Sequence, residues 1–120
     1  RIVLLNTEAS ALGARYDACA RGYFAAAEHD LTGGRTAKLR ASVWRNDTGV
    51  DVDCHLYAVG PSVTIASVTS LAMAPDTVTS ADFAAALVSA GDTQLELVIS
   101  DANNSPYYAF CGYAEVIIGP

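Results

Sequence analysis

The sequence predicts an all-β fold, an antiparallel β-sandwich of seven or eight strands, and three observations support it. Apolar and polar residues alternate along residues 38–45 and 50–59, as they do in strands with one buried face. Other runs rich in Val, Thr, Ile and Leu are separated by clusters of turn-forming residues. The four prolines lie at turns or at the last position, so none interrupts a strand. Short strands at this spacing are typical of an antiparallel sandwich.

The two alternating runs are expected to form a hairpin. They are separated by Asn-Asp-Thr-Gly at residues 46–49, which is a turn-forming sequence. A register that pairs Val43 with Cys54 brings Arg40 opposite Tyr57 on the outer face. We therefore expect a polar, solvated outer face on this hairpin.

Four further strands are expected elsewhere in the chain. Their residues are largely β-branched or alternate in polarity, and turn formers flank them. Gly112, inside the last of them, indicates a β-bulge or a close approach of another segment. The four strands are residues 2–6, 62–73, 93–100 and 107–118.

Two segments are ambiguous in the sequence. Residues 16–29 are rich in alanine and fit a helix, although the Gly-Tyr-Phe that begins at Gly22 also permits a short strand. Residues 78–88 have a helical composition but lie among expected strands. Because local propensity is a weak guide, we interpret 78–88 as a strand.

Length and charge limit the class of protein. The chain has 120 residues, which suits a single domain. Its net charge is −6 and its isoelectric point is near 4.5, so we expect no nucleic-acid partner. No run approaches the roughly 18 apolar residues of a membrane-spanning helix, so we expect no membrane insertion.

Charge is distributed unevenly along the chain. All seven Lys and Arg residues lie in residues 1–45, where four acids leave a net charge of +3. Residues 46–120 hold nine acids and no Lys or Arg, a net charge of −9. One end could therefore attract an acidic partner surface or a neighbouring copy. Alternatively, the fold interleaves the two parts and the asymmetry averages out.

Within the single domain we distinguish an N-terminal strand and docking segment, residues 1–35, from the β-sandwich, residues 36–120. A short terminal strand can add to the exposed sheet edge of a partner, and arginines can pair with its carboxylates. The residues expected to bind the partner are Ile2, Leu4, Arg15, Arg21, Tyr23 and Phe24.

The three cysteines, Cys19, Cys54 and Cys111, lack the close spacing of a zinc site or a disulfide-rich scaffold. We expect them to be small buried hydrophobic residues in a chain made in a reducing cytoplasm. A bridge between Cys54 and Cys111 remains an alternative, because both are expected on strands.

The sequence carries no strong sign of catalysis. It contains no Gly-x-Ser-x-Gly, Walker loop or His-Glu-x-x-His motif, and only two histidines. We therefore expect no enzyme activity and no cofactor. Asp51, Asp53 and His55 share one strand face at a spacing that could hold a metal, but a hard ion prefers more oxygen ligands. We interpret this face as solvated and expect no metal.

Aromatic residues suggest a carbohydrate site. Trp44 is expected on the outer face, where its ring could stack on a sugar with Arg40 and Tyr57 nearby. The alternative is that these rings pack in the core or against a neighbouring subunit. A second group of rings that could stack on a sugar is Tyr107, Tyr108 and Tyr113.

Three segments carry a family resemblance. Residues 38–44 (KLRASVW), 54–59 (CHLYAV) and 112–118 (GYAEVII) look like strands of jelly-roll domains from tailed-bacteriophage virions. Such domains occur in capsid decoration proteins, head fibres and tail fibres, and they resemble carbohydrate-binding modules in architecture. The resemblance covers residues 36–119.

The resemblance implies a jelly-roll-like, non-enzymatic virion structural protein assembled in the host cytoplasm. Its expected role is a capsid decoration or head-fibre protein that binds the major capsid protein or neighbouring copies of itself. The alternative is a carbohydrate-binding, receptor-recognition domain of a tail fibre or a secreted enzyme, with a cell-surface glycan as the partner.

Overall fold

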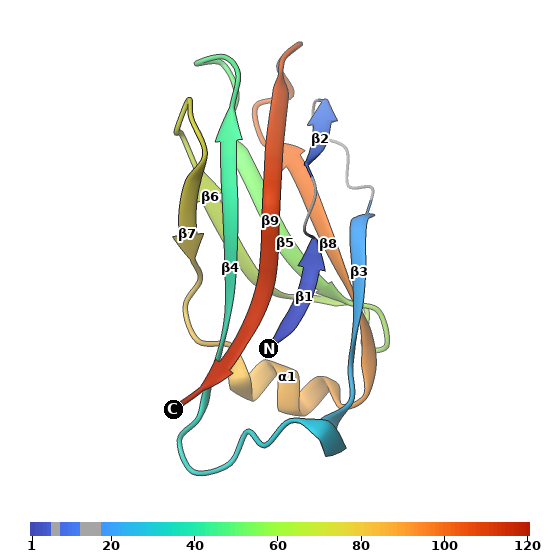
Figure 1. Cartoon of the computed structure of the whole chain (residues 1–120). Helices are drawn as coiled ribbons and strands as arrows, with labels where there is room; N and C mark the ends of the chain where they lie inside the picture. The colour runs from blue at the N-terminus through green and yellow to red at the C-terminus, as the bar shows by residue number, and fades with distance from the viewer. Residues whose placement is uncertain (6–7, 13–17) are drawn as a thin grey trace.

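The computed structural model describes residues 1–5, 8–12 and 18–120, and its strands form two antiparallel sheets (Figure 1). This confirms the predicted all-β antiparallel sandwich, with nine strands in the described residues. In the first sheet the order is β1-β9-β4-β7, and β2 also pairs with β9. The strands of this sheet are β1 (Ile2–Leu5), β2 (Ala9–Leu12), β4 (Thr36–Arg45), β7 (Asp76–Thr79) and β9 (Tyr108–Gly119).

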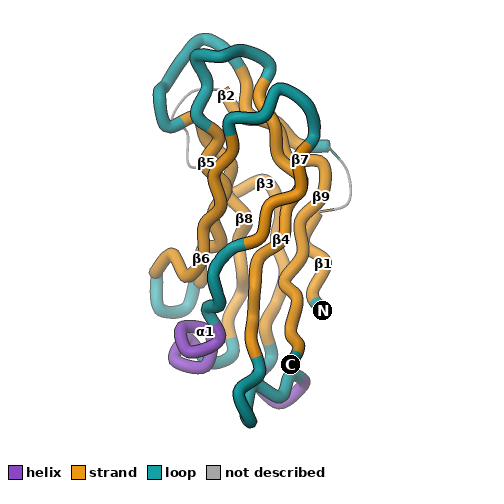
Figure 2. The backbone as a smooth tube through the Cα atoms, turned by 90° about the vertical axis from the view of Figure 1, so that its left-hand side faces the viewer, coloured by secondary structure: helices purple, strands orange, loops and turns teal. Residues whose placement is uncertain are grey.

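The second sheet has the order β3-β8-β5-β6 and packs on the first. In the side view of Figure 2, the short helix α1 (Ala84–Ala90) lies at one end of the molecule. The apolar core lies between the sheets. The strands of the second sheet are β3 (Ala18–Phe24), β5 (Val52–Ala58), β6 (Val63–Ser70) and β8 (Thr93–Asp101).

The alternating pattern correctly predicts the inner faces of β4 and β5. In β4 the side chains of Leu39, Ala41 and Val43 are fully buried, while their neighbours are partly or fully exposed. Strand β5 alternates in the same way, with Leu56 among its buried residues. Both strands thus contribute every second side chain to the same core.

The predicted hairpin between β4 and β5 is wrong, because the two strands belong to opposite sheets. Strand β4 pairs with β7 and β9, whereas β5 pairs with β6 and β8. The Arg45 guanidinium donates to the carbonyls of Thr48 and Val50, both at 3.0 Å. Val50 is fully buried. The turn formers therefore make a corner that crosses from one layer to the other.

The two ambiguous segments differ in outcome. Within residues 16–29 the described part forms strand β3 followed by a 3₁₀ turn, Ala26–Glu28. The interpretation of residues 78–88 as a strand is wrong beyond Thr79, because helix α1 begins at Ala84. The carboxylate of Asp82 accepts hydrogen bonds from the backbone N–H groups of Ala84 and Ala37, both at 2.9 Å. It therefore ties the first turn of the helix to β4.

The predicted bulge at Gly112 is confirmed. Ser42 of β4 pairs with Tyr113, but the next residue, Val43, pairs with Cys111. Gly112 therefore has no partner in the ladder, and β9 gains one extra residue relative to β4.

The N-terminal strands are built into both sheets. Strands β1 and β2 pair with β9, and β3 pairs with β8. Leu4 of β1 is buried against Gly22 of β3, where an added Cβ would lie 2.7 Å from the Leu4 Cδ2 atom. Gly22 thus leaves room for β1 to close the edge of the core.

We predict that Gly22→Ala lowers the free energy of unfolding by roughly 1–3 kcal/mol, because the new methyl group overpacks this contact. Gly119→Ala is the matched control, since nothing lies within 4 Å of a Cβ at that position. Urea unfolding of both variants measures the difference, and equal stabilities would contradict the packing described here.

Candidate functional site

Three aromatic rings lie next to one another on the outer face of the first sheet, two of them across neighbouring strands and the third further along β9. Trp44 of β4 is paired with Phe110 of β9, and their rings stack with centroids 5.4 Å apart and planes 8° apart. The ring of Tyr108 follows, 6.3 Å from that of Phe110. Tyr108 is 41% exposed, and the other two rings are partly exposed. We call the outer surface formed by Tyr108, Phe110, Trp44, Tyr113, Arg40 and Glu115 the aromatic face.

The bulge at Gly112 determines which residues reach this face. A Cβ at Gly112 would lie 3.2 Å from both Cη2 and Cζ3 of Trp44, so the indole edge rests against the glycine backbone. The extra residue also inverts the alternation of β9. Before it, Cys111 is buried and Phe110 faces outward; after it, Ala114 is buried and Tyr113 faces outward.

Polar groups on the aromatic face converge on Glu115, whose side chain is only 1% exposed. Its Oε1 lies 2.6 Å from Arg40 Nη2, and its Oε2 lies 2.7 Å from Arg1 Nε. The Tyr113 hydroxyl donates to the same Oε2 and accepts a hydrogen bond from Arg1 at 2.7 Å. A carboxylate is thus enclosed by two guanidinium groups and a phenol.

The electrostatic balance at Glu115 favours the charged form. Burial by itself would raise the pKa of this carboxyl. Hydrogen bonds from Tyr113 and Arg40, together with the charges of Arg1 and Arg40, outweigh the burial and lower the pKa below its usual value. Glu115 is therefore an ionised anchor for both arginines at neutral pH.

The structure divides the residues predicted to bind a glycan. Trp44 and Arg40 share the aromatic face, but Tyr57 lies on β5, on the outer face of the opposite sheet. The reason is the layer crossing between β4 and β5. Of the second predicted group, Tyr108 and Tyr113 belong to the aromatic face.

Tyr107, the remaining member of that group, precedes β9 and is 44% exposed. Sequence reasoning missed the roles of Phe110, Glu115 and Arg1. The signal available for Phe110 was its position opposite Trp44 once the bulge at Gly112 sets the register.

The residues predicted to dock a partner are dispersed. Leu4 and Phe24 are buried in the chain's own core, and Ile2 is partly buried. Arg21 lies 3.2 Å from Glu96 in an exposed ion pair within the chain. Tyr23 is 59% exposed. The sixth residue of this set, Arg15, lies outside the described residues.

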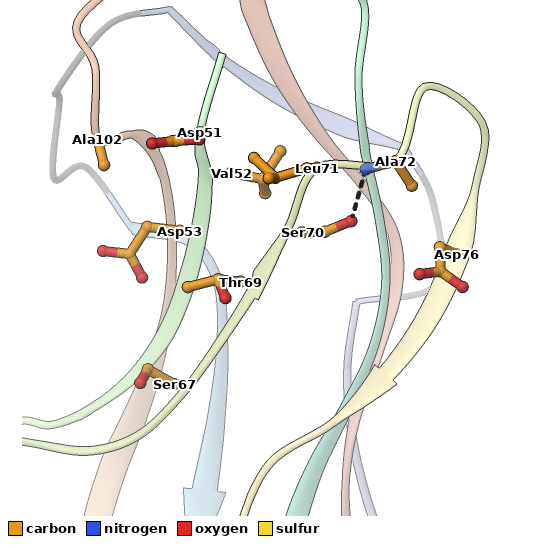
Figure 3. A pocket seen from close by; sticks show the side chains of 10 residues that line it. All are labelled: Asp51, Val52, Asp53, Ser67, Thr69, Ser70, Leu71, Ala72, Asp76 and Ala102. Atoms are coloured by element: carbon orange, nitrogen blue, oxygen red, sulfur yellow. Dashed lines mark hydrogen bonds between the residues drawn. The ribbon is translucent and has the colours of Figure 1, made fainter. Parts of the chain in front are cut away.

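A groove of about 860 Å³ lies beside the ends of β5 and β6 (Figure 3). Three carboxylates line it, from Asp51, Asp53 and Asp76, together with hydroxyl groups of β6. The Asp53 carboxylate also lies 3.9 Å from Nδ1 of His55. Within the part of the chain that the structure describes, no three His, Cys, Asp or Glu side chains are placed to hold a metal ion.

Comparisons with known proteins find no counterpart: no family model, no curated protein and no solved structure matches the chain. Among the described residues, no helix has the length and apolar character needed to cross a bilayer. The fold and the site define the class of protein as an all-β sandwich with an aromatic outer face.

We predict that acid destabilises the protein through Glu115. Because folding lowers the pKa of this carboxyl, its contribution is present above the ordinary value near 4.5 and is lost as the pH falls through the lowered folded value. Glu115→Gln should cost roughly 1–3 kcal/mol at pH 7 and make stability depend less steeply on pH below about 4.5.

The measurement is urea unfolding between pH 7 and pH 3. Glu28→Gln, which removes an exposed carboxylate from the 3₁₀ turn, is the control and should retain the acid sensitivity of the parent chain. If Glu115→Gln retains it equally, the ion pairs on the aromatic face do not stabilise the fold.

Proposed function

We propose that this chain is a non-enzymatic recognition domain that binds a carbohydrate on its aromatic face, as receptor-recognition domains of tail fibres do. The observation that carries the proposal is the group of rings formed by Trp44, Phe110 and Tyr108 on an outer sheet face. Aromatic faces attract the apolar C–H faces of sugar rings. The cores of such sites combine a few aromatic groups with a few oriented polar ones.

Hydrogen-bonding groups flank the rings on the side of β7. Ser42 is paired with Thr77 and Arg40 with Thr79, so hydroxyl and guanidinium groups follow the aromatic rings along the sheet. Sugar hydroxyls are suitable partners for these donors and acceptors. Arg40 is 45% exposed and already held by Glu115, so little conformational entropy is lost when it binds a ligand.

Trp44 and Phe110 lie outside the core, which supports a role in binding in addition to a role in stability. The core is filled by side chains from the inner faces of the two sheets, whereas Trp44 and Phe110 lie outside it. Their stacking adds about 1 kcal/mol to the fold beyond the contribution of the apolar area that the rings bury. A buried tryptophan would instead contribute roughly 3–5 kcal/mol.

We predict that Trp44→Ala abolishes glycan binding, or weakens it at least tenfold, while the free energy of unfolding falls by less than the roughly 3–5 kcal/mol that truncating a fully buried tryptophan costs. Binding is measured by glycan array and then by titration of the best ligand. Because Trp44 is the only tryptophan, its fluorescence reports ligand stacking directly in the parent chain.

Tyr57→Ala is the matched control, since it removes an aromatic ring from the opposite face of the sandwich and should leave binding unchanged. Equal losses in both variants, or a loss of stability near 3–5 kcal/mol for Trp44→Ala, would contradict a sugar site at Trp44.

A second candidate function is capsid decoration or a head-fibre role, in which the domain binds the major capsid protein or copies of itself. The observation that favours it is the edge strand β3, which presents the exposed Tyr23 and Arg21 outward. An exposed aromatic residue beside an arginine is typical of residues that dominate protein interfaces. The virion setting of either function rests on the family resemblance.

For this second function we predict that the domain co-sediments with empty capsids of the virus that encodes it. The double variant Tyr23→Ala, Arg21→Ala should weaken co-sedimentation at least tenfold, and salt should weaken binding of the parent chain because exposed charges are screened. Trp44→Ala is the control and should sediment normally. Undiminished binding by the double variant would place the docking surface elsewhere.

A further inference from the structure

Two cysteines face each other across the core. Cys54 belongs to β5 of the second sheet and Cys111 to β9 of the first, and both side chains are fully buried. A side-chain hydrogen bond links the two thiols between the layers, and the Cys111 thiol also donates to the backbone carbonyl of Tyr113 at 3.3 Å. All three cysteines of the chain are free thiols in this structure.

The third cysteine, Cys19, bonds to the backbone of the second sheet. It lies on β3 and is partly buried, and its thiol donates to the backbone carbonyl of Leu97 at 3.3 Å. This bond holds its sulfur at the backbone of β8. The cysteines therefore comprise one hydrogen-bonded pair and a third thiol that interacts with the pair through charge alone.

We propose that Cys54 and Cys111 form a modification site, an inter-sheet disulfide produced by a disulfide oxidant such as oxidised glutathione, while Cys19 stays reduced. The geometry requires little rearrangement, because thiols in hydrogen-bond contact need to approach by only about 2 Å to reach the S–S bond length. The inference is independent of the proposed function.

The reaction proceeds by two exchanges. The Cys111 thiolate attacks one sulfur of oxidised glutathione, which forms a mixed disulfide and releases one glutathione thiolate. The Cys54 sulfur then loses its proton and attacks the Cys111 sulfur, which forms the protein disulfide and releases the second thiolate. Two protein thiols are oxidised, one glutathione disulfide is reduced, and the two protons pass to the glutathione thiolates.

The environment of each thiol suits this order. The hydrogen bond from Cys54 lowers the pKa of Cys111, whereas the same bond and burial raise the pKa of Cys54. Burial raises the pKa of Cys19 to about 11. Less Cys19 than Cys111 is therefore present as the nucleophilic thiolate, although Cys111 is fully buried and Cys19 only partly buried.

A bond at this position closes a long loop. Cys54 and Cys111 are 57 positions apart in the chain, and the bond would link β5 to β9 and so join the two sheets covalently. Closing a loop of this length restricts the unfolded chain strongly, so the oxidised protein is expected to be the more stable form.

The test compares the reduced protein with protein refolded in excess oxidised glutathione. We expect the oxidised sample to lose roughly 2 Da, to retain one reactive thiol under denaturing conditions, and to melt about 10 °C higher. Peptide mapping should identify the Cys54–Cys111 link. Adding oxidant to the folded protein should give the same product more slowly, because both thiols are buried.

Cys19→Ala is the matched control and should form the bond as the parent does, whereas Cys54→Ala and Cys111→Ala should each prevent it. Alanine is chosen because it places no hydroxyl group in the core. Circular dichroism checks that each variant retains its strands. Three reactive thiols after refolding, a bond that includes Cys19, or a lower melting temperature after oxidation would each overturn the proposal.

Discussion

The extra residue at Gly112 is the constraint on which the outer surface of the first sheet depends. Strands alternate their side chains, so an uninterrupted β9 that buries Cys111 would also bury Tyr113 and Glu115. The bulge inverts the alternation and keeps Cys111 and Ala114 in the core. Tyr113 and Glu115 then reach the outer surface with Phe110. Glycine fits closely there, because a side chain would push the indole of Trp44 aside by a few tenths of an ångström.

The enclosed carboxylate of Glu115 shows how this surface is ordered. Taking a charge away from water is unfavourable unless partners replace the lost hydration, and here Arg1, Arg40 and Tyr113 supply them. The same contacts hold Arg1 over β9 and fix Arg40 on the aromatic face. One buried charge thus orders both the start of β1 and the polar border of the candidate site.

The sequence predicts side-chain direction better than it predicts strand partners. Alternation identifies the buried residues of β4 and β5, because the pattern is a local property of each strand. It does not show that the turn at 46–49 crosses between layers, since the same turn formers serve a hairpin and a corner. The prediction that Tyr57 lies on the same face as Trp44 is therefore wrong, because β5 belongs to the opposite sheet.

Other differences also arise from long-range structure. The helical composition of residues 84–90 prevails over the surrounding strands, because Asp82 anchors the helix start to β4. Leu4 and Phe24 are predicted to dock a partner, but both are buried in the core. The sequence alone does not show that β1 pairs with β9 and so closes the edge of the core. The link between Arg1 and Glu115 spans nearly the whole chain, and no local pattern indicates it.

The central position of β9 also governs the order of folding during synthesis. Strands β1, β2 and β4 all pair with β9, and the ribosome makes them first. The first sheet therefore cannot close until β9 has emerged, and its earlier strands meanwhile expose unpaired backbone. Such non-local pairing slows folding and favours association between nascent chains. Strand β9 is thus the last element that the first sheet needs before its backbone groups are paired.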